Sequence, residues 1–303
     1  MLQGTVTVVT GGSRGIGKEI AKAQAEAGAK VAIIARNPNA VSAAASEIGG
    51  AGAVARGFAA DLSDRAAVEA VFAAIATELG PVDTLINNAG VFSAIGPIWE
   101  VDPDAWWDDI EINLKSAFHC ARAVLPSMLS RGRGRIVNMI GGGTSTPLAF
   151  GSAYSVSKTG TLRLTECIAA TLEGTGVVCL AMDPGLVLTD LTRYQMESAA
   201  GTKYMPNVGK RLASGDHLPP SYAARLALEI ARGRFDRLAG RAVRAYDDLD
   251  EVDASTDDIL ARDLRVLRVT GFAPSPGPAG RPGTPDGPAP GDAGQPSNGG
   301  AAG

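Results

Sequence analysis

From residue 6 to about residue 269, the chain alternates short runs of β-branched and apolar residues with longer runs rich in alanine. The short runs predict strands at residues 5–10, 30–35, 53–59, 84–87, 135–140, 177–182 and 242–245. The longer runs predict helices at residues 16–27, 40–48, 65–79, 103–130, 154–172 and 220–232. This alternation indicates crossover units and a parallel sheet covered on both faces. Residues 31–35, Val-Ala-Ile-Ile-Ala, are apolar without alternation, which is typical of a strand buried on both faces. The expected fold class is therefore α/β, with a single doubly wound parallel sheet.

One domain is expected over residues 1–272, because no change in composition divides this part of the chain. Residues 273–303 differ in kind, since proline and glycine dominate and no apolar residue larger than alanine occurs. Such a segment cannot bury enough surface to offset its chain entropy. We therefore predict a disordered tail, with a polyproline-type ligand for a partner domain as the alternative.

Charge and composition argue against several classes of function. The net charge of −4 and the pI of about 5.3 give no support for nucleic-acid binding, which usually needs a basic face. Cys120, Cys167 and Cys179 lack metal-ligand spacing, and His119 and His217 are too few for a histidine-based site, so no metal is expected. No apolar run approaches the ~20 residues of a membrane span. The first strand begins almost at the first residue, which leaves no room for a signal peptide, so the expected location is the cytoplasm.

A glycine-rich turn follows the first predicted strand directly. Residues 10–17 read Thr-Gly-Gly-Ser-Arg-Gly-Ile-Gly and open the first predicted helix. Glycines let a backbone approach a pyrophosphate closely, and a helix N-terminus favours its negative charge. A turn without a ligand is the alternative, but a strand before the turn and a helix after it favour a nucleotide site of the Rossmann type.

Tyr154 and Lys158 are four residues apart in a predicted helix and therefore share one face of it. A free phenol titrates near ~10 and is a poor acid or base at neutral pH. A nearby ammonium stabilises the phenolate, which makes the pair a candidate for proton transfer at a carbonyl or alcohol oxygen.

These segments occur in order with Asp61-Leu62, with residues 87–90 (Asn-Asn-Ala-Gly), with Asn113, and with Pro184-Gly185 and Thr189. Over about residues 4–245 the chain thereby resembles the short-chain dehydrogenase/reductase family. The resemblance implies a nicotinamide dinucleotide, and hydride transfer between its nicotinamide ring and a carbonyl or alcohol carbon.

The resemblance also implies a role for each matching position. Tyr154 would be the general acid in reduction and the base in oxidation. Lys158 would hold the nicotinamide ribose hydroxyls and lower the Tyr154 pKa, and Asn113 would interrupt a long helix and hold a water of the proton relay. The predicted catalytic residues are Tyr154, Lys158 and Asn113. The predicted cofactor-binding residues are Gly11, Ser13, Arg14, Gly15, Ile16, Gly17, Arg36, Asp61, Leu62, Asn88, Ala89, Gly90, Tyr154, Lys158, Pro184, Gly185, Val187 and Thr189.

Some of these positions have a plainer interpretation. Asn113 could be a surface residue of a helix, and Asp61 could be only a helix N-cap, a role that Ser63 and Asp64 also suit.

The end of the second predicted strand bears on the cofactor. A carboxylate there would accept hydrogen bonds from a free ribose 2′-hydroxyl, but the sequence reads Ala35-Arg36. Arg36, together with Arg14 of the glycine-rich turn, suits a 2′-phosphate. NADP(H) is therefore favoured over NAD(H), unless Arg36 only stacks on adenine or faces solvent.

One position departs from the family pattern. The family usually has a serine about thirteen residues before the tyrosine, where it bonds the substrate oxygen, and Gly141 stands there. Thr144 or Ser145 could supply the hydroxyl, or a backbone N–H of the glycine turn could act as the donor. Otherwise the protein binds the cofactor without reductase turnover, in a regulatory or scaffolding role, or it catalyses a non-redox reaction such as epimerisation or dehydration.

Residues 186–220 are expected to form a long loop that covers the substrate, with Tyr and Met side chains that suit a mainly apolar carbonyl or alcohol. The resemblance further implies a homodimer or homotetramer that packs through the helices at 103–130 and 154–172. The function expected from the sequence is an NADP(H)-dependent oxidoreductase acting on a small-molecule substrate, with no nucleic-acid or membrane partner.

Overall fold

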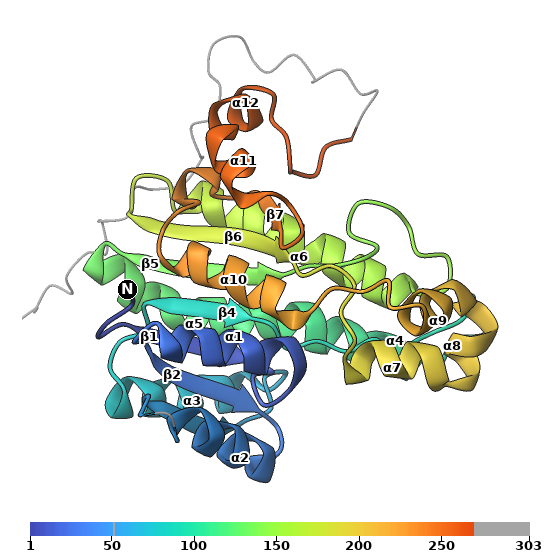
Figure 1. Cartoon of the computed structure of the whole chain (residues 1–303), viewed down its shortest axis with the longest axis horizontal. Helices are drawn as coiled ribbons and strands as arrows, with labels where there is room; N and C mark the ends of the chain where they lie inside the picture. Colours follow the sequence, from blue (N-terminus) through green and yellow to red (C-terminus); the bar gives the residue numbers. More distant parts are fainter. Residues whose placement is uncertain (51, 270–303) are drawn as a thin grey trace, which may run out of the picture. The chain divides into compact units, whose positions relative to one another are not determined.

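The computed structural model describes residues 1–50 and 52–269, of which Met1–Leu267 form one compact unit. In this part, seven parallel strands form one sheet in the order β3-β2-β1-β4-β5-β6-β7 (Figure 1). Their bounds are β1 (Val6–Thr10), β2 (Lys30–Ala35), β3 (Ala55–Ala59), β4 (Thr84–Asn87), β5 (Gly134–Met139), β6 (Val177–Asp183) and β7 (Ala242–Arg244). The α/β class and the doubly wound parallel sheet predicted from the alternating pattern are confirmed. The tail predicted at residues 273–303 lies outside the described residues.

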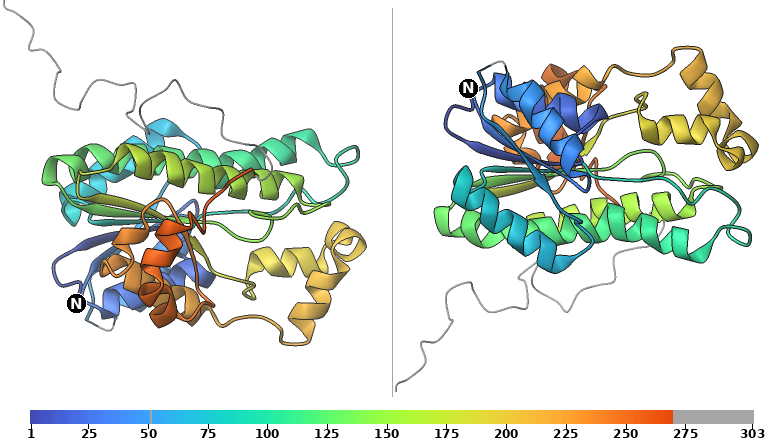
Figure 2. Two further views of the ribbon diagram at one scale, coloured as in Figure 1. Left: turned by 90° about the horizontal axis from the view of Figure 1, so that it is seen from above. Right: turned by 90° about the horizontal axis from the view of Figure 1, so that it is seen from below.

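Helices cover both faces of the sheet, which lies between them as the middle layer (Figure 2). One face carries α1 (Gly15–Glu26), α2 (Pro38–Gly49) and α10 (Pro220–Ala231), and the other carries α3 (Arg65–Glu78), α5 (Ser116–Arg131) and α6 (Ser152–Thr171). Neighbouring strand residues serve opposite faces: Val9 and Ile33 belong to the first apolar cluster, and Val8 and Ile34 to the second. Two-sided burial explains why these strands are apolar without alternation.

The strand order reverses between β1 and β4, and a doubly wound sheet has its ligand crevice at such a point, beyond the carboxyl ends of the strands. A buried polar link stiffens the neighbouring part of the sheet. Asn87 of β4 donates to the side-chain oxygen of Asn138 on β5 at 2.8 Å, and Asn138 donates to the Thr165 hydroxyl of α6 at 2.9 Å. Helix α6, which carries Tyr154 and Lys158, is thereby tied to the two central strands.

The helix predicted at residues 103–130 is divided in three. It consists of α4 (Pro103–Ile110), a π-helical turn (Glu111–Lys115) and α5, and Asn113 lies in the π-helical turn. The expectation that Asn113 interrupts a long helix is confirmed, and π-turns of this kind are frequent at functional sites.

The prediction that residues 186–220 form a long loop is wrong in one respect, because this segment contains three short helices. These are α7 (Asp190–Glu197), α8 (Ala199–Tyr204) and α9 (Pro206–Ala213). We call the segment 190–213 the lid. Thr189 and Ser198 cap α7 and α8, and proline opens α9. Two further short helices follow β7, α11 (Leu249–Ala254) and α12 (Thr256–Ala261). No helix of the described chain is long and apolar enough to cross a membrane.

Candidate active site

The glycine-rich turn between β1 and α1 packs directly against the end of β4. Gly11 has a φ of +63°, and a Cβ atom there would lie 3.0 Å from the Cα atom of Ala89. A Cβ atom at Gly17 would lie 2.5 Å from the Gly11 carbonyl oxygen. The Asn88 side chain donates to the Thr10 carbonyl at 2.9 Å. Only glycine fits these two positions, and Arg14 and Gly15 of the turn are exposed.

The Thr10 side chain joins the two strands at the reversal point. Its hydroxyl accepts the backbone N–H groups of Asn88 and Ala89, each at 3.0 Å. The predicted segment 88–90 is thus brought to the glycine-rich turn, and Asn88 supports that turn with its side chain.

Three predicted catalytic residues meet at the next strand end. The Lys158 ammonium donates to the Met139 carbonyl at 3.0 Å and lies 5.6 Å from the centre of the Tyr154 ring. A Cβ atom at Gly90 would lie 3.1 Å from the Asn113 side-chain oxygen and 3.5 Å from the Lys158 nitrogen. Tyr154, Lys158 and Asn113 therefore gather beside Gly90.

Asn113 is buried, and both its amide nitrogen and its amide oxygen are hydrogen-bonded. Its amide nitrogen donates to the Val91 carbonyl at 2.9 Å and to the Ser157 hydroxyl at 3.0 Å, and its oxygen accepts the Val91 N–H at 2.8 Å. The alternative that Asn113 is a surface residue is wrong, because only 2% of it is exposed. Its side chain instead fixes the loop that begins at Val91.

The Tyr154 ring is held between two neighbours. Phe92 stacks on it with ring centres 4.4 Å apart and planes 6° apart, and a Cβ atom at Gly141 would lie 2.9 Å from its hydroxyl oxygen. The position that carries serine in the family thus faces the Tyr154 hydroxyl here, without a side chain. That hydroxyl forms no hydrogen bond to any residue that the structure describes, which leaves it open to a substrate oxygen.

The two hydroxyls considered as substitutes for the missing serine lie elsewhere. Thr144 donates to the Gly141 carbonyl at 2.7 Å and accepts the Gly141 N–H at 3.3 Å, so its hydroxyl closes the turn. Ser145 is exposed. Ser155 holds the same turn from α6, since its hydroxyl donates to the Gly143 carbonyl at 2.7 Å. The backbone N–H groups of Gly142 and Gly143 bond to no described residue.

Burial controls the protonation of Tyr154 and Lys158. It raises the pKa of Tyr154 above its usual range, and the carboxylates of Asp183 and Asp109 raise it further. Burial lowers the pKa of Lys158 to about 8, while Asp183 acts in the opposite direction. The expected lowering of the Tyr154 pKa is not found, because desolvation of the phenolate dominates.

The segment after β6 reaches back to the glycine-rich turn. Gly185 has a φ of +75°, and its N–H donates to the Asp183 carboxylate at 2.9 Å. A Cβ atom at Gly15 would lie 3.4 Å from the Thr189 methyl group, and Arg14 forms an ion pair with Asp190. The start of the lid therefore lies over the turn.

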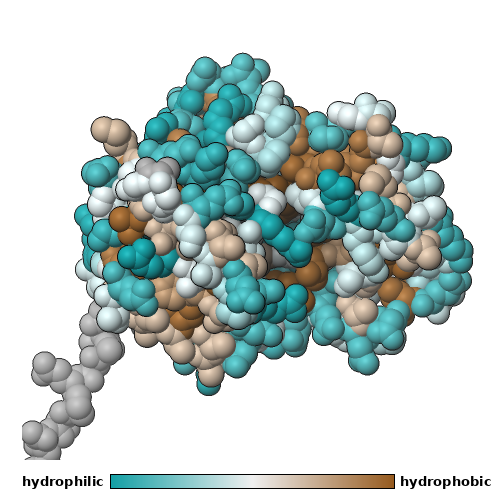
Figure 3. All heavy atoms as spheres, turned by 60° about the horizontal axis from the view of Figure 1, so that its bottom comes forward, coloured by the Kyte–Doolittle hydropathy of each residue, from teal (hydrophilic) through white to brown (hydrophobic). Residues whose placement is uncertain are grey.

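The tip of the lid contacts the opposite side of the cleft. The Tyr204 hydroxyl donates to Glu100 at 2.6 Å, and its ring stacks on Phe150 with centres 5.1 Å apart. Figure 3 shows a hollow between the lid side of the molecule, at right, and the rest, with apolar atoms exposed in it. A hollow lined by exposed apolar atoms suits an apolar ligand better than a charged one.

The remaining predicted cofactor residues are near the ends of β2 and β3, in the glycine-rich turn, or directly after β6. Arg36 is exposed and forms no ion pair with a described residue, whereas Asp61 accepts the N–H and hydroxyl of Ser63 at 2.9 and 2.8 Å. These two bonds, and then Arg36 and Lys115, lower the Asp61 pKa. The alternative that Asp61 caps a helix is wrong, because Asp64 caps α3. Leu62, Pro184 and Val187 are buried, and Ser13 and Ile16 are half-buried.

The comparison with known families agrees with this geometry. A sequence model described as short chain dehydrogenase matches residues 5–200. The chain belongs to the short chain dehydrogenase family. The resemblance inferred from the ordered motifs is thereby confirmed, and with it membership of a class of oxidoreductases that act on alcohol and carbonyl groups.

Individual members of the family are similar over most of the folded part. A short chain dehydrogenase of Pseudocercospora fijiensis is 40% identical over 192 residues, which are 63% of this chain and 62% of that protein. The 2-dehydro-3-deoxy-L-rhamnonate dehydrogenase (NAD(+)) of a Sphingomonas species is 40% identical over 183 residues, which are 60% of this chain and 71% of that protein. The match thus spans less than two thirds of the first relative.

A solved structure extends the likeness to three dimensions. The gluconate 5-dehydrogenase of Burkholderia cenocepacia, in complex with NADP and tartrate, superposes with a TM-score of 0.72 and 28% identity. The superposition covers 80% of this chain and 94% of that one.

Sequence reasoning missed three residues that shape this short chain dehydrogenase site. Phe92 stacks on Tyr154, Asp183 is the last residue of β6, and Asp109 accepts the N–H groups of Ser93 and Ala94, each at 3.0 Å. A buried carboxylate on α4 therefore holds the loop that carries Phe92. A carboxylate directly before Pro184 was the one available signal, because strand ends of this sheet carry the functional groups.

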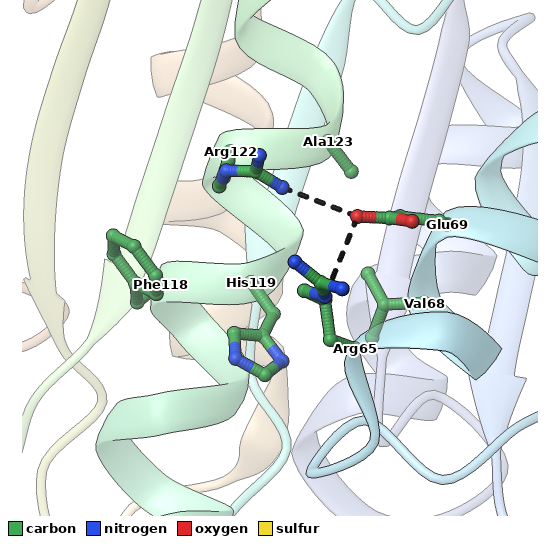
Figure 4. A pocket seen from close by; sticks show the side chains of 7 residues that line it. All are labelled: Arg65, Val68, Glu69, Phe118, His119, Arg122 and Ala123. Carbon is green, nitrogen blue, oxygen red and sulfur yellow. Dashed lines mark hydrogen bonds and ion pairs between the residues drawn. The ribbon is translucent and has the colours of Figure 1, made fainter.

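A separate pocket of about 200 Å³ lies between α3 and α5 (Figure 4). It is lined by Arg65, Val68, Glu69, Phe118, His119, Arg122 and Ala123. Glu69 pairs with both arginines, at 3.8 Å from Arg65 and 3.2 Å from Arg122. None of the predicted catalytic or cofactor-binding residues lines this pocket.

Proposed function

We propose that the protein is an NADP(H)-dependent oxidoreductase that transfers a hydride between the nicotinamide and a mainly apolar carbonyl or alcohol. The observation that carries the proposal is the convergence of the free Tyr154 hydroxyl, the buried Lys158 ammonium and the Asn113 amide beside Gly90, in the segment that packs on the glycine-rich turn. A protein that only bound nucleotide would not need this arrangement.

The residues present fit a nicotinamide dinucleotide. The glycine-rich turn opens α1 at positions where side chains would clash, which suits a pyrophosphate. Lys158 is only 4% exposed, and among the described residues its ammonium has one hydrogen-bond acceptor, the Met139 carbonyl. Buried ammonium groups need several acceptors, and ribose hydroxyls would supply them. When bound, the dinucleotide supplies or accepts the hydride.

Tyr154 handles the proton. Because burial raises its pKa, the phenol is protonated at neutral pH and can donate to a carbonyl oxygen. This protonation state is the one that carbonyl reduction requires of the acid. Lys158 orients the ribose, and Asn113 fixes the loop that carries Phe92 and, through it, the plane of the Tyr154 ring.

Arg36 supports NADP(H) over NAD(H). It is exposed at the end of β2, forms no ion pair with a described residue, and no carboxylate precedes it. Arg14 supports this preference less, because it forms an ion pair with Asp190. The relatives include both an NADP complex and an enzyme named for NAD(+).

A second candidate rests on Gly141. Because no side-chain hydroxyl accompanies Tyr154 at the reacting oxygen, the chain could bind the cofactor without net redox turnover, either as a binding protein or as an epimerase or dehydratase. Tight NADPH binding without oxidation by any carbonyl would favour this candidate.

The test is NADPH oxidation at 340 nm against a panel of apolar ketones and aldehydes, run beside NADH. We expect turnover, with a lower KM for NADPH than for NADH. We expect Tyr154→Phe to reduce kcat by at least ~100-fold, the lower end of the range for loss of a general acid. Tyr194→Phe is the matched control, because this lid tyrosine is exposed and its hydroxyl bonds to no described residue. Wild-type turnover that survives in Tyr154→Phe would contradict the proposal.

A further inference from the structure

Asp183 brings a carboxylate to the strand edge at which Tyr154 and Lys158 meet. It is the last residue of β6, one position beyond Met182, which pairs in register with Met139 of β5. The Met139 carbonyl accepts the hydrogen bond of the Lys158 ammonium at 3.0 Å. Asp183 and the Lys158 ammonium are therefore at the same edge of the sheet, on adjacent strands.

Two hydrogen bonds fix the Asp183 side chain. One oxygen accepts the Gly185 N–H at 2.9 Å, and the other accepts the Tyr246 hydroxyl at 3.3 Å. The Arg244 guanidinium lies 5.1 Å from the centre of the Tyr246 ring, but it forms an ion pair with Asp247 at 2.8 Å. Within the described chain Asp183 has no ion-pair partner of its own, so its charge is not neutralised locally.

Among the groups around Lys158, Asp183 is the anion that acts on its ammonium. The Asn113 amide and the Tyr154 phenol are neutral, and Asp109 acts on Tyr154 rather than on Lys158. Burial pushes the Lys158 pKa down to about 8, and Asp183 is the group that raises it. An ammonium this deep in the protein needs a nearby anion to stay charged at neutral pH.

We propose that Asp183 is the counter-ion of Lys158 and a positioning residue of the site. Its carboxylate keeps the ammonium charged, and it holds the Pro184–Gly185 turn through the Gly185 N–H. The inference rests on the proposed function in one respect, since charged Lys158 is taken to bind the ribose hydroxyls. Asp183 itself need not touch the substrate.

The test is the pH dependence of NADPH binding, followed by nucleotide fluorescence, in the wild type and in Asp183→Asn. The amide oxygen of asparagine can still accept the Gly185 N–H, so the substitution removes charge and keeps the turn. Without the anion Lys158 loses its proton at lower pH, and the midpoint at which binding weakens should fall by roughly half a unit to one unit. A midpoint unchanged from the wild type would overturn the proposal.

Two further variants separate charge from structure. Asp183→Glu keeps the carboxylate and should restore a midpoint near that of the wild type. Tyr246→Phe removes the hydrogen bond to Asp183 at 3.3 Å but leaves the Asp183 charge, so the midpoint of NADPH binding should stay at the wild-type value. If Asp183→Glu shifts as far as Asp183→Asn, the role of Asp183 is structural and the counter-ion proposal fails.

A measurement on the protein without cofactor tests the counter-ion role independently of NADPH binding. Nitrogen-15 NMR of the lysine side chains reports the Lys158 charge directly, with Lys158→Met giving the assignment. If the wild type binds no NADPH, the proposed function fails, while a lower Lys158 pKa in Asp183→Asn still supports the counter-ion. An unchanged Lys158 titration overturns it whether or not NADPH binds.

Discussion

At the scale of single residues, the chemistry depends on what surrounds the Tyr154 hydroxyl. Phe92 fixes the ring by stacking, and Gly141 leaves open the place where a side-chain hydroxyl would stand. The Thr144 hydroxyl cannot fill that place, because its bonds to Gly141 close the turn. In the described chain the substrate oxygen would therefore meet one side-chain donor where the family usually has two.

Gly141→Ser should raise kcat/KM for carbonyl reduction by about 100-fold, the lower end of the effect of one oxyanion-hole donor. The added Cβ atom would lie 2.9 Å from the Tyr154 oxygen. That oxygen is the far end of a side chain and can shift by the few tenths of an ångström required. Steady-state kinetics on the best substrate of the panel measures the gain.

Gly141→Ala is the matched control for this prediction, because it adds the same Cβ atom without the hydroxyl. It should leave kcat/KM unchanged or lower. Equal gains in both variants would mean that filling space, rather than supplying a donor, improves the site.

The sequence identifies residues of this site where the contact is local. Tyr154 and Lys158 are one helical turn apart, and the glycines of residues 11–17 serve a turn whose need for glycine is visible in the motif. Asp183 and Phe92 are not identifiable in this way. Their roles depend on β5 lying beside β6 and on the loop after β4 folding over α6, which are contacts between distant segments.

At the scale of elements, the lid is held at its start and at its tip. At its start Arg14 of the glycine-rich turn pairs with Asp190, and at its tip Tyr204 bonds Glu100 and stacks on Phe150. Both contacts join segments more than fifty residues apart in the sequence. The lid therefore connects the glycine-rich turn with the segments that carry Glu100 and Phe150.

The three helices of the lid were not predicted from the sequence, and the reason is physical. They have eight, six and eight residues, about two turns each. So few turns give too few repeats of apolar residues for the helical period to be recognised in the sequence. Gly201 and Gly209 lower the helix propensity further. Helices this short depend on caps and on packing, of which only the caps are visible in the sequence.

Tyr204→Phe should open the lid more often, because it removes the hydrogen bond to Glu100 and keeps the ring on Phe150. We expect KM for the carbonyl substrate to rise about 3- to 10-fold, since one solvent-exposed hydrogen bond is lost. The kcat should stay or rise, because lid opening often limits product release. Kinetics and limited proteolysis within residues 190–213 measure the two effects.

The same change at another tyrosine of the lid controls for general loosening. Tyr194 on α7 is 46% exposed, and its hydroxyl bonds to no described residue, so Tyr194→Phe should match the wild type in both assays. Cleavage of Tyr204→Phe at the wild-type rate would show that the contact with Glu100 does not hold the lid.

At the scale of the whole molecule, the sheet was predictable because its determinants repeat along the chain. Seven apolar runs, each followed by a turn, specify parallel strands, and the rule of right-handed crossovers leaves few possible arrangements. Assembly is less visible in the sequence, because the small residues of α5 and α6 suit packing within one chain as well as between two. We propose a homo-oligomer that associates through these helices, where Phe118 and Val156 are exposed.

Sedimentation velocity at micromolar concentration should therefore give a multiple of the 30.9 kDa chain mass. Phe118 is 48% exposed on α5, and Phe118→Asp should place a charge in the interface and weaken association at least tenfold, since buried aromatic anchors contribute more than about 1.4 kcal/mol. Tyr222→Asp makes a like change on α10, on the opposite face of the sheet, and should leave the mass unchanged. A wild-type chain that sediments as a monomer, or a Phe118→Asp variant as associated as the wild type, would exclude this interface.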